Sequence, residues 1–226
     1  GELGHFPMYI IRKQRILKYW LKIVTKKPPI VFDVYKMLVN DAENGKTNWA
    51  SNVRTLLNDL GYNFLWYNQE NVFFSYDVLK LRLYDQFIQS WHSSMLDCEK
   101  LDILKMFKID FCLEKYLLLD VNVKLLTQLR CGSLKLNIET GRYNNVPRNE
   151  RLCQCCNMKA IENEYHFVMI CPAYRHLRLR FLPKYYCSWP NMSKCLSLIQ
   201  TCSRTLVLKL CCLLNENWKL RSQLIK

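Results

Sequence analysis

Hydrophobic residues recur at three- and four-residue intervals along most of the chain, as in helices that each bury one face. No segment alternates hydrophobic and polar residues in the manner of a half-buried strand. Residues 62–73 are rich in aromatic side chains and follow neither period. The sequence therefore predicts a mostly α protein. Its predicted helices cover residues 7–27, 30–39, 48–60, 75–95, 98–108, 111–118, from 120 or 122 to about 131, 172–182, 191–202 and 205–224, with a loop at 141–151.

The first predicted helix carries one basic stripe. Five basic side chains fall within about 120° of one another at 3.6 residues per turn. No acidic residue interrupts residues 3–32, which favours contact between the stripe and a nucleic-acid backbone. An ordinary solvated helix surface and binding to a membrane surface are the alternatives. The five residues are Arg12, Arg15, Lys18, Lys22 and Lys26.

Turn-forming residues divide the chain into three predicted segments. Pro28 and Pro29 end the first helix, so residues 1–27 form a basic amphipathic helix. Residues 28–137 form a helical domain. Residues 138–226 contain a small irregular unit near 148–175, followed by C-terminal helices.

Composition and charge narrow the functional classes. Half of the 226 residues are hydrophobic, which excludes general disorder. The 33 basic and 19 acidic residues give a net charge of +14. The segments 1–29 and 121–226 carry +6 and +12, whereas residues 30–120 carry −4. Two basic regions predict contact with RNA or DNA phosphates, although a solvated basic surface without a ligand is the simpler alternative.

No run of residues approaches the roughly 18 apolar positions of a membrane-spanning helix. Residues 1–7 do not resemble a signal peptide. We therefore expect an intracellular protein, nuclear or cytoplasmic, that does not insert into a membrane.

The cysteines indicate a metal site. Ten of the twelve lie from Cys131 onward, and without a secretory signal metal binding or burial is favoured over disulfides. A C-x2-C-x9-H-x4-C pattern supplies four soft ligands within 19 residues, as a structural tetrahedral Zn²⁺ requires. Because the protein fills all four positions, the zinc would not be catalytic. The predicted ligands are Cys153, Cys156, His166 and Cys171.

The local geometry of this motif is constrained at its last ligand. A continuous α-helix would place His166 and Cys171 about 140° apart. Pro172 disfavours α geometry at Cys171, so we expect the chain to unwind there and turn back to the metal. Cys155 remains an alternative ligand that could replace Cys153 or Cys156.

Arginines flank the predicted metal site. Some would compensate the net negative charge of three thiolates around one Zn²⁺. Their number exceeds that need, so we predict phosphate contacts for the remainder. The predicted contacts near the zinc are Arg148, Arg151, Arg175 and Arg178, and those on the first helix are Arg12, Arg15, Lys18 and Lys22.

The segments GELGHFPMYI, TNWASNVRTLLNDLG, DQFIQSWHSSM and IETGRYNNVPRNERLCQCCNMKAIENEYHFVMICPAY carry a family resemblance. Together they resemble the C-terminal region of reverse-transcriptase-like proteins from non-LTR (LINE-type) retrotransposons. The resemblance implies a zinc-binding CCHC motif that contacts nucleic acid, and an upstream polymerase domain that residues 1–27 would follow. The chain departs from the family at Leu134, where members often carry His.

The sequence thus predicts a non-catalytic, zinc-stabilised, nucleic-acid-binding part of a longer polypeptide. No Asp-Asp pair of the kind that holds polymerase metal ions occurs in the chain. The alternatives are a protein-interaction scaffold, in which the zinc is only structural, and an inert remnant of a decayed element.

Overall fold

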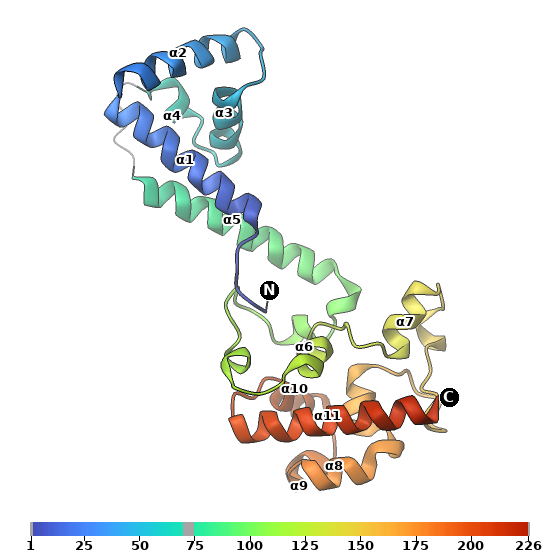
Figure 1. Ribbon diagram of the computed structural model, residues 1–226. Helices are drawn as coiled ribbons and strands as arrows, with labels where there is room; N and C mark the ends of the chain where they lie inside the picture. The colour runs from blue at the N-terminus through green and yellow to red at the C-terminus, as the bar shows by residue number, and fades with distance from the viewer. Residues whose placement is uncertain (1, 70–74, 226) are drawn as a thin grey trace. The chain divides into compact units, whose positions relative to one another are not determined.

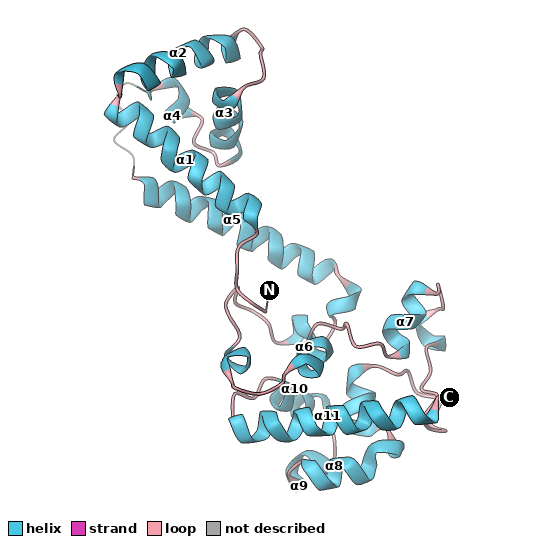
Figure 2. Cartoon of the chain, viewed as in Figure 1, coloured by secondary structure: helices cyan, strands magenta, loops and turns pink. Residues whose placement is uncertain are grey.

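The computed structural model describes residues 2–69 and 75–225. Helices dominate these residues, and extended pairing within them is limited to two isolated bridges, Leu3 with Leu113 and Leu152 with Ile161 (Figure 2). The predicted mostly α fold is confirmed. The chain forms two compact units, which we call the N-terminal unit (residues 5–93) and the C-terminal unit (residues 1–4 and 94–226).

The N-terminal unit is a helical cluster around one hydrophobic core (Figure 1). Side chains of its first and third helices, including Leu17, Trp20 and Leu57, are completely buried. The Trp20 indole donates a hydrogen bond of 3.0 Å to the Tyr35 hydroxyl and so fastens the first helix to the second. The helices are α1 (Met8–Lys26), α2 (Pro29–Glu43), α3 (Trp49–Asp59), α4 (Phe64–Tyr67) and α5 (Tyr76–Asp97).

This division differs from the predicted segments. Helix α1 is not a separate linker, because its hydrophobic arc supplies part of the core of the N-terminal unit. The boundary between the two units falls inside α5, at residues 93 and 94, and not near residue 137. The periodicity of α1 correctly located a buried face, but it could not show which other helices cover that face.

The C-terminal unit is built around the long helix α11 (Arg204–Leu224), which packs against α6 (Lys124–Arg130) and α8 (Arg175–Phe181) (Figure 1). Hydrophobic residues of α11 such as Leu210, Leu213 and Leu214 are buried in the core. Leu134 is buried in the same core. The remaining helices of this unit are α7 (Asn137–Tyr143), α9 (Lys184–Cys187) and α10 (Met192–Ile199).

Two predictions for this unit are wrong. The helices expected at 98–108 and 111–118 are instead three short 3-10 turns, Glu99–Leu101, Leu104–Met106 and Lys115–Leu118. The loop expected at 141–151 begins later, because α7 continues to Tyr143. Between residues 98 and 118 the main chain is arranged around the buried side chain of Lys108. The Lys108 ammonium group pairs with Glu114 and donates a hydrogen bond to the Cys112 carbonyl.

A buried ionic network ties the first residues of the chain to the C-terminal unit. The Arg130 side chain is 1% exposed and pairs with Glu2 at 3.2 Å and with Glu114 at 2.6 Å. Its guanidinium also lies 4.4 and 4.5 Å from the ring centroids of Phe107 and Tyr116. These contacts explain why residues 2–4 belong to a unit that otherwise begins at residue 94.

Within the described part of the chain, no single helix is both long and apolar enough to cross a membrane. Helices α10 and α11 meet that test only when taken together, and they are bent by 110° at their junction.

Candidate metal centre

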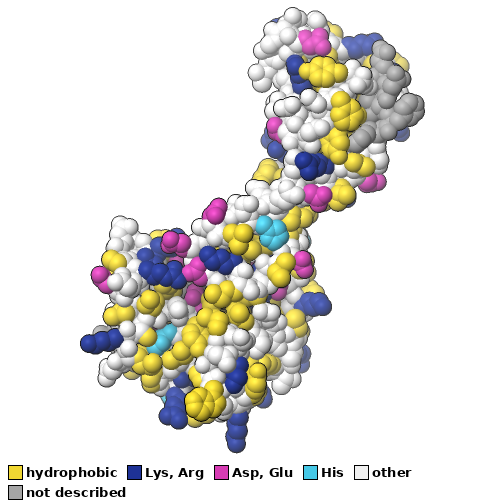
Figure 3. Space-filling view, turned by 180° about the vertical axis from the view of Figure 1, so that it is seen from behind, with side chains coloured by type: hydrophobic (Ala, Val, Ile, Leu, Met, Phe, Trp, Pro, Cys, Tyr) yellow, Lys and Arg dark blue, Asp and Glu magenta, His cyan; other side chains and the backbone are white. Residues whose placement is uncertain are grey.

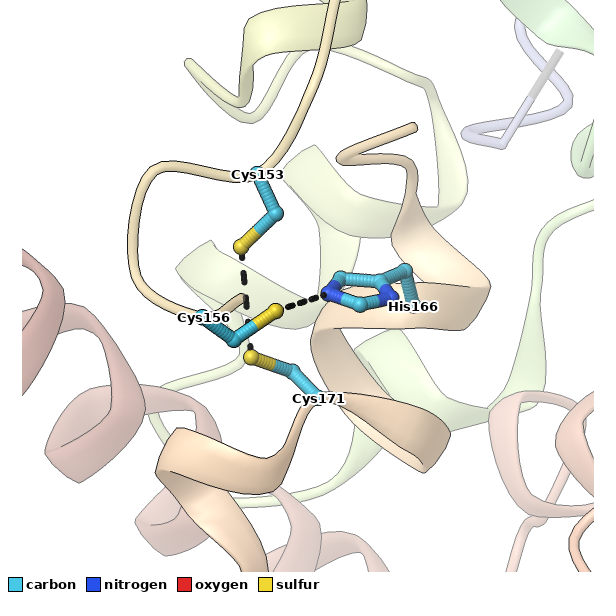
Figure 4. Close-up of side chains that lie close together, drawn as sticks. All are labelled: Cys153, Cys156, His166 and Cys171. Carbon is cyan, nitrogen blue, oxygen red and sulfur yellow. Dashed lines mark hydrogen bonds between the residues drawn. The ribbon is translucent and has the colours of Figure 1, made fainter. Parts of the chain in front are cut away.

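The first two predicted ligands lie on a tight loop whose ends are held together. Leu152 and Ile161 form an antiparallel bridge, and the Cys153 amide donates to the Ala160 carbonyl at 2.8 Å. Lys159 adopts a left-handed conformation, with φ of 51°, where the loop turns back. This closure directs the side chains of Cys153 and Cys156 to the same side of the loop (Figure 4).

The other two ligands lie at the two ends of a π-helical turn, His166–Ile170. The Asn163 side chain begins this helical segment by accepting a hydrogen bond of 2.8 Å from the His166 amide. At its end, the Cys171 amide donates to the His166 carbonyl at 2.8 Å, which is the i to i+5 spacing of a π-turn. A π-turn contains more residues per turn than an α-helix. The rotation about the helix axis from His166 to Cys171 is therefore smaller than the 140° expected for an α-helix.

Cys171 leaves the helix in an extended conformation, with φ of −49° and ψ of 122°. This confirms the unwinding that Pro172 predicts. The sequence did not reveal the π-turn, because it requires one extra residue in the helical turn without any characteristic residue type.

The four predicted ligands come together in space. The Sγ atoms of Cys153 and Cys171 lie 3.9 Å apart, and the Cys156 Sγ lies 3.5 Å from the His166 Nε2 (Figure 4). All four ligand atoms lie within 4.8 Å of one another. Cys153, His166 and Cys171 are buried and Cys156 is half-buried. The cluster could hold one metal ion.

The raised pKa of Cys153 indicates that a bound cation would stabilise the ionised form of the cysteines at this site. The neighbouring Cys171 thiol and burial raise the pKa of Cys153 to about 12. Two buried sulfurs at this distance cannot both ionise readily without a nearby positive charge. A divalent ion favours the thiolate form of its ligands, so binding would displace protons from these sulfurs.

Cys155 belongs to a second, weaker group of potential ligands, with Cys153 and Glu162. The Glu162 carboxylate already accepts two hydrogen bonds of 2.7 Å from Arg221 and one of 2.8 Å from the Asn137 amide. A metal at this second position would have to displace Arg221. The geometry therefore favours Cys156 over Cys155.

The segment that carries the four candidate ligands, residues 151–175, which we call the metal-binding segment, is not an independent module. Phe167, Val168 and Met169 lie in the core of the C-terminal unit, next to residues of α8 and α11. The Phe167 ring packs edge-on against the buried Tyr174 ring, with centroids 5.1 Å apart. The irregular unit expected from the sequence is present, but it is built into the helical core.

Of the four arginines predicted to contact phosphates, three have partners within the protein. Arg178 is 7% exposed and donates to the Ile170 carbonyl at 3.2 Å, beside the last metal ligand. Arg151 donates at 2.9 Å to the carbonyls of Val146 and Ile138, and Arg148 pairs with Asp102 at 2.5 Å. Arg175 is exposed and, within the described residues, forms no ion pair.

The burial of Arg178 disfavours its predicted phosphate contact. Its guanidinium instead places a positive charge near Cys171. That position suits compensation of three thiolates, which the sequence offered as the alternative role for these arginines.

The basic stripe of α1 is exposed along its length, and none of its members forms an ion pair with another described residue. Lys and Arg side chains lie on the surfaces of both units in the view of Figure 3. The exposed members of the stripe are Arg12, Arg15, Lys18, Lys22 and Lys26.

The residues that support the candidate ligands were not predicted from the sequence. Asn163 was recognisable as a helix-capping residue three positions before His166. Nothing in the sequence identified Arg221, because it lies 59 positions from its partner Glu162.

Comparison with known proteins finds no matching family model, curated protein or solved structure.

Proposed function

We propose that the metal centre is a structural zinc site. With Zn–S bonds of about 2.3 Å and Zn–N bonds of about 2.0 Å, a tetrahedral site has S···S edges of about 3.8 Å and S···N edges of about 3.5 Å. The observed separations of 3.9 Å between two sulfurs and 3.5 Å between sulfur and nitrogen agree with both values. Three thiolates and one imidazole also form a donor set that zinc prefers.

We further propose that the protein binds single-stranded RNA or DNA without performing catalysis. The single observation that carries this proposal is the exposed basic stripe on α1, whose members form no ion pair with another described residue. The net charge of +14 supports it, since each Lys or Arg that meets a phosphate releases condensed counterions. The sequence resemblance to the C-terminal region of LINE-type reverse-transcriptase-like proteins agrees with this role and suggests an upstream polymerase domain as partner.

Binding to a 20-nucleotide single-stranded RNA or DNA, measured by fluorescence anisotropy at several salt concentrations, tests the proposal. We expect the affinity to fall steeply as salt rises. The double variant Arg15→Gln/Lys22→Gln should reduce the slope of log K against log salt by about 1.4, because two phosphate contacts are lost.

The matched control is Lys36→Gln/Lys46→Gln, which removes two exposed charges of the same unit that already pair with Asp33 and Asp41. This variant should retain the slope of the unmodified protein. Absence of binding at low salt would contradict the proposal and favour a protein-interaction scaffold.

A further inference from the structure

A cavity of about 180 Å³ lies in the C-terminal unit, next to the metal-binding segment. Its apolar wall consists of two isoleucines and two methionines, Ile103, Met106, Ile138 and Met192. Basic side chains of Arg142 and Arg148 line it as well, and both residues are exposed. Glu164, two residues before the ligand His166, also lines the cavity.

Glu164 differs from the paired acidic residues of this cavity. Glu139 pairs with Lys100 and Arg142, each at 3.1 Å. Asp102 pairs with Lys105 at 2.9 Å, and with Arg148. These carboxylates need no ligand to balance them.

The Glu164 residue is 7% exposed, so it is more than nine-tenths buried. Among the described residues, its carboxylate has no ion-pair partner. A buried polar group without partners is costly, and such groups in proteins usually meet a ligand or water. Glu164 lines the cavity, where a ligand with N–H groups would supply hydrogen bonds to its carboxylate.

We propose that this cavity binds an unpaired guanine base. Guanine presents two adjacent donors, N1–H and N2–H, which match the two oxygens of one carboxylate. The isoleucine and methionine side chains would pack against the faces of the flat ring. The exposed Arg142 and Arg148 would lie near the phosphates that flank the base.

Other bases fit the carboxylate less well. Adenine and cytosine each offer one amino group and no adjacent N–H, and uracil offers a single N–H between two carbonyl oxygens that a carboxylate repels. Single-strand recognition commonly proceeds by hydrogen bonds to the Watson–Crick edge of such exposed bases. The inference rests on the proposed function, because a bound strand would supply the base.

The test compares the octanucleotides U8 and UUUGUUUU by fluorescence anisotropy. The unmodified protein should bind the guanine-containing strand roughly tenfold more tightly, which lies within the usual range for one bidentate base contact. Glu164→Gln should abolish this preference while leaving the affinity for U8 and its salt dependence unchanged. Zinc content and circular dichroism would show that the variant folds.

The matched control is Glu150→Gln, which alters an exposed carboxylate outside this cavity. It should retain the guanine preference. Equal affinity of the unmodified protein for the two strands, or a preference that survives Glu164→Gln, would overturn the proposal.

A second measurement separates this inference from the proposed function. Guanosine 5′-monophosphate and uridine 5′-monophosphate are titrated into the whole chain and followed by NMR chemical shifts. We expect shifts around Glu164 with the guanosine nucleotide alone, and none in Glu164→Gln. If no strand binds but this selective response is present, the proposed function fails and the guanine site stands. If the two nucleotides behave alike, the guanine site is overturned whether or not a strand binds.

Discussion

Cys155 and Cys156 are neighbours in the chain with different surroundings. The Cys156 sulfur lies 3.5 Å from the His166 imidazole, in the group of four potential ligands. Cys155 shares its group with a carboxylate that Arg221 already holds. Spacing alone left both cysteines as candidates, and the direction of each side chain distinguishes them.

We predict that Cys156→Ser loses the bound zinc and that Cys155→Ser keeps close to one zinc per chain. A hydroxyl group is a much poorer zinc ligand than a thiolate, so replacement of a true ligand leaves an incomplete site. Metal analysis of the two purified variants measures the outcome. Retention in Cys156→Ser together with loss in Cys155→Ser would assign the site to Cys155.

At the scale of elements, helix α11 holds the metal-binding loop in place through one buried ion pair. Glu162 is 1% exposed and follows the bridge that closes the loop, and Arg221 donates to both of its carboxylate oxygens at 2.7 Å. The same carboxylate accepts from the first amide of α7, at Asn137. Three elements that are distant in sequence therefore share one buried carboxylate.

Arg221→Met should destabilise the protein by about 3–5 kcal/mol, because the change leaves the Glu162 carboxylate buried without its cation. The control on the same helix is Lys219→Met, which breaks an exposed pair with Glu216. That change should cost less than about 1 kcal/mol. Urea unfolding of both variants gives the two values. Equal effects would show that the buried pair does not anchor the loop.

At the scale of the whole molecule, the two units have separate hydrophobic cores. The core of the N-terminal unit is made of residues from α1 to α5, whereas the candidate metal ligands Cys153 and Cys171 belong to the core of the C-terminal unit. The bound metal would therefore stabilise one unit directly. Structural zinc sites contribute apparent binding free energies of about 10–16 kcal/mol at neutral pH in small peptides.

Removal of the metal with a chelator should increase hydrogen exchange in residues 151–175 and in the adjoining helices α8 and α11. Helices α1 and α3 should keep their protection, because their buried faces belong to the separate core of the N-terminal unit. Hydrogen-exchange mass spectrometry with and without chelator measures both regions. A chelator should change nothing in Cys156→Ser, which has already lost its metal. A similar rise in both units would contradict the separation of the cores.

The sequence by itself determined the features that depend on local spacing. The periodicity of residues 8–26 located the buried and basic faces of α1, and Pro172 indicated where the chain would unwind. The Cys/His spacing identified the four side chains that converge. In each case the relevant residues lie within about 20 positions of one another. Over such short separations, helix geometry and the restricted backbone before proline determine the direction in which each side chain points.

Only the tertiary structure decided the features that depend on what covers each residue. Sequence patterns treat Arg175 and Arg178 alike, yet one is exposed and the other is buried beside Cys171. The sequence also does not show that Glu164, which has no ion-pair partner among the described residues, lines a cavity together with residues 99–106, α7 and α10. Burial and pairing are set by elements far away in the chain, and no local pattern records which elements will meet.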